Sequence, residues 1–169
     1  VIPFWEGTGW SFEGHTSKPQ VGSIAWGYFV STTLNHAGLK VNRYKLAQQS
    51  PINEAKSLAL ELGIIEIAEG SVIENIKAIQ EKVPNGIHFI GFDQSHVGYI
   101  LKSEDGLYLI HSNYVEIRGV EIERIEASSV FPYYHQFYIV PLSTNEYFLK
   151  AWLKGDEIEV VMEWFQSTH

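Results

Sequence analysis

Two histidines mark the ends of two predicted strands that a short turn connects. His96 begins one apolar segment and His111 ends the next, with Glu104-Asp105-Gly106 between them. This pattern predicts an antiparallel hairpin, in which both imidazoles can be neighbours on one face of a sheet. Nucleophilic catalysis uses such a pair: one imidazole takes the proton of the nucleophile, and a second polar group fixes the tautomer of the first.

A helix is predicted to begin where a nucleophile would be needed. Ser23 can cap a helix that ends at Gly38, so Ala25 and Trp26 fall in its first turn. The dipole and the free N–H groups of a helix start lower the pKa of a thiol placed there and activate it. The chain has no cysteine, however. Alanine carries no nucleophile and indole offers only an N–H donor, so we expect the chain as it stands to be inactive.

The elements around these residues change from helical to strand-like periodicity along the chain. Helical spacing and cap residues predict helices over residues 51–62 and 72–83, and a short helix is expected over 144–153. Strands are expected over residues 87–92, 97–101, 107–110, 115–117, 137–140 and 158–165. Helices in the first half and strands in the second predict an α+β fold, and residues 1–169 are interpreted as a single domain.

Composition narrows the classes of function. Hydrophobic residues make up 45% of the 169 and charged residues 19%, as in a globular domain. The net charge of −8 argues against nucleic acid or an anionic membrane as a partner. No apolar run reaches the roughly 18 residues that span a bilayer. The lack of cysteine excludes disulfides and thiolate metal sites, and no metal or organic cofactor is expected. The start at Val1 rather than Met indicates a trimmed chain or a mature form that is secreted or periplasmic.

Three blocks of the sequence resemble the NlpC-type cysteine peptidases of the papain-like superfamily. Ser95-His96-Val97-Gly98-Tyr99 is similar to the strand that begins with the catalytic histidine of that family, and Leu109-Ile110-His111-Ser112 is similar to the hairpin that ends in its orienting histidine. Trp26-Gly27-Tyr28-Phe29-Val30 resembles the nucleophile helix, where a cysteine precedes small residues and an apolar pair. The resemblance covers about residues 10–115. It implies a bacterial protein in which N-terminal helices pack on an antiparallel sheet.

The resemblance leaves two positions open for the missing cysteine. Related bacterial sequences that read A-C-G-Y-F-V place it at Trp26, which would mean a natural loss of chemistry. In papain itself the nucleophile precedes a tryptophan, so Ala25 would then stand for an engineered Cys→Ala replacement. In that second register Gln20 approximates the oxyanion-hole glutamine. Trp10 is a candidate for a wall of the substrate cleft, and Asn113 is a second candidate for the orienting group.

The resemblance also implies a reaction and a substrate class. The parental reaction is amide hydrolysis through a thioester, with His96 as general base and acid, His111 as its orienting group and peptide amides, cell-wall peptides first, as substrates. Since the nucleophile is missing, we expect a domain of the thiol hydrolase type that is inactive. The alternative is a natural pseudoenzyme that binds peptides or glycans through aromatic side chains such as Tyr133, Tyr134 and Tyr138.

Overall fold

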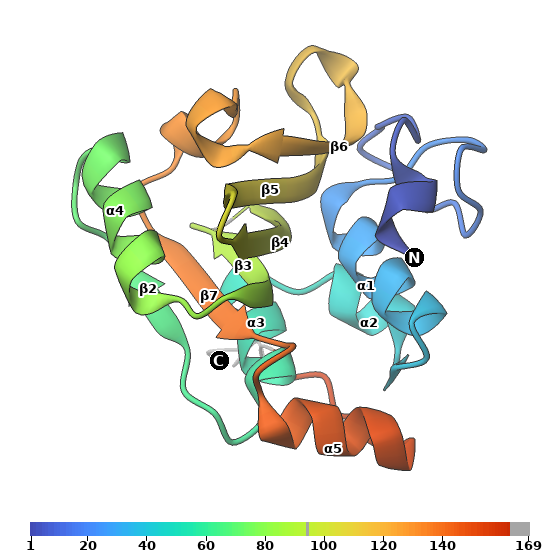
Figure 1. The fold of residues 1–169 in the computed structure, drawn as a ribbon. Helices are drawn as coiled ribbons and strands as arrows, with labels where there is room; N and C mark the ends of the chain where they lie inside the picture. Colours follow the sequence, from blue (N-terminus) through green and yellow to red (C-terminus); the bar gives the residue numbers. More distant parts are fainter. Residues whose placement is uncertain (94, 163–169) are drawn as a thin grey trace, which may run out of the picture.

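The computed structural model describes residues 1–93 and 95–162 and combines helices with an antiparallel sheet (Figure 1). Six strands form this sheet in the order β2-β7-β3-β4-β5-β6, and every neighbouring pair is antiparallel. The strands are β2 (Ile65–Ile67), β3 (Gly86–Phe92), β4 (His96–Ser103), β5 (Gly106–Asn113), β6 (Gly119–Arg124) and β7 (Phe137–Pro141). Two short strands, β1 (Lys40–Val41) and β8 (Glu157–Ile158), pair in parallel beside it.

Helices cover both faces of the six-stranded sheet, with α4 on one side and α1 on the other (Figure 1). Their bounds are α1 (Trp26–His36), α2 (Arg43–Ala47), α3 (Pro51–Ala59), α4 (Val72–Lys82) and α5 (Glu146–Lys154). The start of α4 carries the capping box that its sequence predicts, because Ser71 and Glu74 each bond the backbone N–H of the other. The α+β class and the antiparallel sheet are therefore as predicted.

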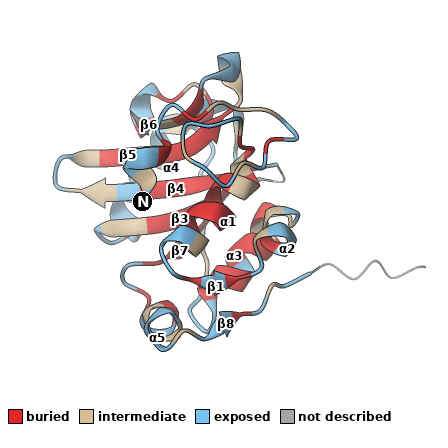
Figure 2. Ribbon diagram, turned by 90° about the vertical axis from the view of Figure 1, so that its right-hand side faces the viewer, coloured by how far each residue is buried: buried red, intermediate tan, exposed pale blue. Residues whose placement is uncertain are grey.

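The two faces of the sheet belong to two separate hydrophobic cores. Side chains alternate along each strand, so Phe89, Val97 and Tyr99 join the core that contains α1 and α3, whereas Ile90 and Ile100 join the core that contains α4. Burial is concentrated in the central strands and in α1 (Figure 2). Because β3, β4 and β5 are covered on both faces, residues at their ends are held by rigid, well-packed elements.

Several predicted elements differ from the structure. Residues 115–117 form a 3-10 turn rather than a strand, and Glu116 and Ile117 have positive φ angles that a strand does not allow. The predicted strand over residues 158–165 is only the pair Glu157–Ile158, and residues 163–165 lie outside the described residues. β2 and β6 are not predicted from the sequence. β2 is short, and β6 is rich in charged residues.

The N-terminal arm changes the predicted start of the first helix. Ser23 and Ile24 form bridges with Gly9 and His15 of the arm, so the chain is still extended there. The Ser23 hydroxyl bonds the hydroxyl of Ser11 at 2.6 Å and does not cap a helix. The N-cap is Ala25 instead, which makes the sequence-based cap wrong by two residues. In the described part of the chain, no helix has the length and apolar character that a membrane crossing requires.

One buried acid gives the fold a testable dependence on pH. Glu54 of α3 is 1% exposed, and its Oε2 has no hydrogen-bond partner in the described residues. Burial raises the pKa of this carboxyl well above its ordinary value. The folded state therefore keeps a proton that the unfolded chain releases above about pH 4.3. Glu54 accordingly supports folding fully at acidic pH, and this contribution is lost as the pH rises through the raised pKa.

Glu54→Gln should remove this dependence, because the amide is neutral at every pH. We expect the difference in free energy of unfolding, variant minus parent, to grow in favour of the variant as the pH increases, by no more than about 1.4 kcal/mol per pH unit. Urea unfolding between pH 5 and pH 9 measures it. Glu61→Gln, at an exposed position, is the control and should run parallel to the parent. Parallel curves for Glu54→Gln would show that this carboxyl does not titrate differently on folding.

Candidate functional site

The start of α1 is tied to the strand that carries His111. Ser112, the next residue of β5, donates a hydrogen bond from its hydroxyl to the carbonyl oxygen of Ile24 at 2.6 Å, and both residues are fully buried. The N–H of Ala25 donates to the carbonyl oxygen of Gly14 at 2.8 Å. No side chain in the described part of the chain caps α1, so the first N–H groups of the helix beginning at Trp26 keep their hydrogen-bonding capacity. The sheet thereby fixes a helix N-terminus that can bind negative charge.

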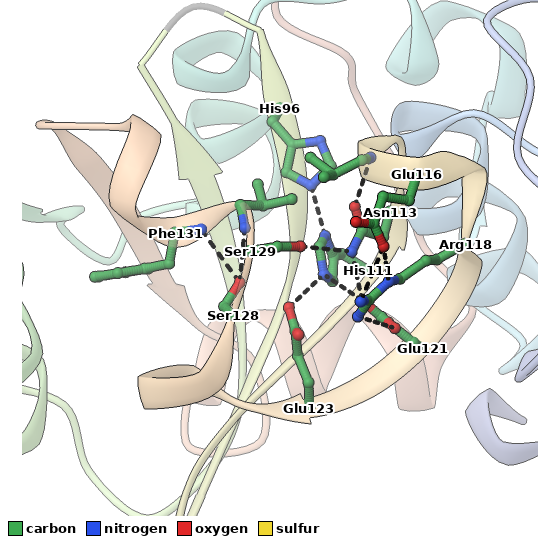
Figure 3. Close-up of polar contacts among 12 residues, drawn as sticks. His96, His111, Asn113, Glu116, Arg118, Glu121, Glu123, Ser128, Ser129 and Phe131 are labelled. Carbon is green, nitrogen blue, oxygen red and sulfur yellow. Dashed lines mark hydrogen bonds and ion pairs between the residues drawn. The ribbon is translucent and has the colours of Figure 1, made fainter.

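His96 and His111 lie on one sheet face and are hydrogen-bonded to each other (Figure 3). The distance from His96 Nε2 to His111 Nδ1 is 2.8 Å, and neither side chain is exposed to solvent. The pairing of Tyr99 with Ile110 sets the register of β4 and β5 and places Gly98 beside His111. The predicted neighbourhood of the two imidazoles is therefore present in the structure.

The carboxylate of Glu123 adds a third member to this hydrogen-bonded pair. Nε2 of His111 lies 3.0 Å from Oε1 of Glu123 and 3.8 Å from Oε1 of Glu121, both on β6 (Figure 3). Burial raises the pKa of Glu123, but hydrogen bonds from His111 and Ser128 and the charges nearby outweigh it and hold this pKa below its ordinary value. Glu123 is therefore ionised at neutral pH. His96, His111 and Glu123 form a continuous line of hydrogen bonds across three strands.

The second ring nitrogen of His96, Nδ1, lies at the end of this line that is farthest from Glu123. Burial, and next the charge that His111 can carry, hold the pKa of His96 well below its usual value, so the imidazole is neutral at pH 7. Its Nδ1 is buried and has no hydrogen-bond partner in the described residues. A buried polar atom without a partner is unfavourable and is a common mark of a functional site.

Trp26 brings α1 to His96 at the end of the sheet where β4 begins. The indole meets the imidazole edge to face, with ring centroids 5.6 Å apart. Its other neighbours are Trp10, stacked at 5.9 Å, Tyr114 at 5.8 Å and Phe12 at 6.1 Å. We call Trp10, Phe12, Trp26 and Tyr114 the aromatic cluster. The ring of Trp26 fills the space directly beside the His96 ring.

The other predicted site residues are distributed unevenly. Ala25 is buried as the N-cap of α1. Asn113 belongs to the network beside His111, where its amide donates to Glu121 and to Ser129. Gln20 is exposed, and its amide donates to the carbonyl oxygen of Phe4 in the arm at 3.5 Å. The structure thus brings Trp10, Trp26, His96 and His111 together, adds Asn113 at the periphery and leaves Gln20 with the arm.

Sequence reasoning misses Glu123 and Tyr114 in this region. Glu121 and Glu123 alternate in Gly119–Arg124, which is the pattern of two side chains on one strand face, but β6 itself is not predicted. Tyr114 directly follows β5 and lies 5.4 Å from the His96 ring, where its hydroxyl bonds that of Tyr134 at 2.9 Å. Burial raises the pKa of Tyr114, so its phenol stays protonated and can act as a hydrogen-bond donor.

Among the described residues, His111, Glu121 and Glu123 bring potential cation ligands within 4.8 Å of one another. The hydrogen bond from His111 to Glu123 and the amide of Asn113 on Glu121 already account for this convergence. We therefore interpret the group as a hydrogen-bond network.

Comparison with known proteins gives no further guidance on this site, because no protein-family model, curated protein or solved structure matches the chain.

β4 and β5 lie so close together at Gly98 that a larger side chain at this position should disturb the site. A Cβ atom at this position would lie 2.6 Å from the carbonyl oxygen of Ile110 and 2.9 Å from Cβ of His111. Gly98→Ala should therefore displace His111 and lower the free energy of unfolding by about 1–3 kcal/mol, as overpacking does. Urea unfolding measures the loss. Gly63→Ala, whose Cβ would meet nothing within 4 Å, is the matched control and should change stability by less than about 0.5 kcal/mol. Equal effects of both substitutions would contradict this account of Gly98.

Proposed function

We propose that this chain is a papain-like domain of the NlpC type, built for amide hydrolysis by a thiol and lacking that thiol at position 26. The observation that carries the proposal is the meeting of a helix start with a buried imidazole, where no described residue caps the helix by its side chain or bonds Nδ1 of the imidazole. The Nε2 atom of that imidazole is hydrogen-bonded to His111, which is in turn hydrogen-bonded to Glu123. A helix start, a base and an orienting group are the three parts that thiol hydrolysis requires.

Position 26 is favoured over position 25 by the contacts of the two side chains. The ring of Trp26 packs directly against His96, with centroids 5.6 Å apart. Ala25 is the buried N-cap, and its backbone N–H is bonded to the arm. A side chain at the first helical position can therefore reach the base.

The proposed chemistry of a cysteine at position 26 follows from these positions. His96 Nδ1 takes the thiol proton, and the thiolate attacks the carbonyl carbon of a peptide amide. The free N–H groups at the start of α1 stabilise the oxyanion. Collapse of this intermediate breaks the C–N bond, and His96 returns the proton to the departing amine, leaving a thioester. Water, deprotonated by His96, then hydrolyses the thioester. Trp26 supplies no attacking electron pair, so the native chain performs none of these steps.

The substrate class proposed for the parental reaction is a peptide amide, with bacterial cell-wall peptides first. This choice comes from the resemblance of the three sequence blocks to NlpC-type peptidases. The aromatic cluster beside His96 is compatible with it, because such rings pack against both sugar faces and peptide side chains.

Trp26→Cys tests the proposal without knowledge of the substrate. A cysteine beside His96 should have a pKa below the ordinary value of about 8.5. Every unit by which this pKa is lowered raises the thiolate fraction at pH 6 about tenfold. We therefore expect iodoacetamide to alkylate the Trp26→Cys protein at least about tenfold faster than the Ala25→Cys protein, and His96→Ala to remove the difference. Release of amines from purified peptidoglycan should accompany the fast alkylation.

Two controls make the result decisive. Trp26→Ala opens the same space without a nucleophile and should release no amine. Thermal unfolding of every variant shows whether the fold is kept. Ordinary thiol reactivity in a folded Trp26→Cys protein, together with no hydrolysis, would refute the proposal for position 26. High reactivity of Ala25→Cys alone would transfer it to position 25.

A binding module is the second candidate, and the packing of Trp26 favours it. The indole is accommodated among Trp10, Phe12 and Tyr114 without displacing the His96–His111 bond. Phe12 of this cluster is 74% exposed, so an aromatic ring beside the site is presented to solvent. Exposed aromatic side chains of this kind are typical of surfaces that bind ligands.

Titration of the native chain with peptidoglycan fragments, followed by NMR, tests this binding role. We expect shifts in the indole N–H signals of Trp10 and Trp26 if the fragments bind at the aromatic cluster. Phe12→Ala should weaken the interaction, whereas Phe4→Ala, also exposed but distant along the arm, should leave it unchanged. Shifts confined to Tyr133 and Tyr138 would place binding outside the hydrolase-type site, whereas Tyr134 stacks on the His96 ring with centroids 6.3 Å apart and reports on the site itself. An unchanged spectrum at millimolar fragment would exclude a binding role for these ligands.

A further inference from the structure

We infer that Glu123 is a positioning residue that fixes the tautomers of His111 and His96 and leaves Nδ1 of His96 unprotonated. The catalytic meaning of this inference rests on the proposed function, but the tautomers themselves do not. The inference starts from three distances along one line of side chains: 3.0 Å from Glu123 to His111, 2.8 Å from His111 to His96 and 5.6 Å between the His96 and Trp26 ring centroids.

The first step is set by the chemistry of a carboxylate. An ionised carboxylate can only accept hydrogen bonds. Its bond to His111 therefore requires the proton of that imidazole to be on Nε2. A neutral imidazole has one protonated nitrogen, so Nδ1 of His111 must then be an acceptor.

The second step transmits this choice to His96. Because Nδ1 of His111 is an acceptor, the hydrogen atom in the 2.8 Å bond must come from Nε2 of His96. In neutral His96 the other nitrogen, Nδ1, then has a free electron pair. That atom is the one that is buried and has no partner in the described residues. The carboxylate thus determines, through two rings, which nitrogen of His96 has the free electron pair and can act as a base.

Glu123 performs this role rather than its neighbour Glu121. Oε1 of Glu121 is 3.8 Å from Nε2 of His111, which is too far for a hydrogen bond. Glu121 instead accepts from the amide of Asn113 and lies 3.9 Å from the guanidinium of Arg118. The two glutamates lie on one strand, near one imidazole, and differ in which of them bonds it (Figure 3). Glu121→Gln is consequently a matched control for Glu123→Gln.

The direct test is imidazole ¹⁵N NMR of the native chain, recorded at pH 8, where an ordinary imidazole is neutral. Two-bond ¹H–¹⁵N correlations distinguish protonated from unprotonated ring nitrogens, and His96→Gln and His111→Gln assign the signals. We expect Nε2 protonated and Nδ1 unprotonated in both rings. A proton on Nδ1 of His96, or on both nitrogens of His111, overturns the inference without the use of any Glu123 variant.

The variants then test the part played by the carboxylate. A glutamine at position 123 can accept or donate, so Glu123→Gln should give a mixture of tautomers at His96, and Glu121→Gln should give the native pattern. A native pattern in Glu123→Gln would also overturn the inference. In the Trp26→Cys background, Glu123→Gln should lower kcat at least about tenfold with little change in KM, and Glu121→Gln should not. If Trp26→Cys has no activity, the proposed function fails while the NMR result still decides the tautomers.

Discussion

The hydrogen bond between His96 and His111 is the interaction on which the rest of the site depends. Both imidazoles are fully buried, and burying a polar ring is unfavourable unless hydrogen bonds compensate for the lost contact with water. Three strands supply them: β4 carries His96, β5 carries His111 and β6 carries Glu123. The register of the sheet therefore sets the chemistry, because a shift of one residue in any of these strands would turn its side chain to the opposite face.

A second constraint joins this sheet face to a helix that packs on the other face. By alternation, His96 and His111 belong to the side of the sheet covered by α4, whereas α1 covers the opposite side. The two meet at the edge where β4 begins, where Ser112 holds the carbonyl of Ile24 and Trp26 reaches the His96 ring. In this way the N-terminus of a helix in one layer and an imidazole of the other layer lie close together, and both are carried by regular secondary structure rather than by a loop.

The sequence predicts those parts of the site whose signals are local. His96 and His111 flank a hairpin whose turn and alternation are visible in one short stretch, and their neighbourhood follows from strand geometry alone. The predicted N-cap is misplaced because Ser23 bonds Ser11 of the arm, a contact that no local pattern encodes. Glu123 is missed for a similar reason. Its strand is short and half charged, and glutamate is depleted in strands, so the alternation of Val120 and Ile122 with the two glutamates is a weak signal and only the pairing with β5 reveals the partner of Glu123.

The buried line of hydrogen bonds beside Trp26 has a structural role that is independent of any chemistry. His96, His111 and Glu123 are joined by hydrogen bonds that link the ends of three strands whatever side chain is at position 26. Removing one member would leave the others as buried polar groups without partners, which is more unfavourable than keeping all three. Residue 26 differs from these three, because among the described residues its side chain contacts the network through ring packing. The hydrogen-bonded line of His96, His111 and Glu123 is therefore held by its own contacts and does not depend on which side chain is at position 26.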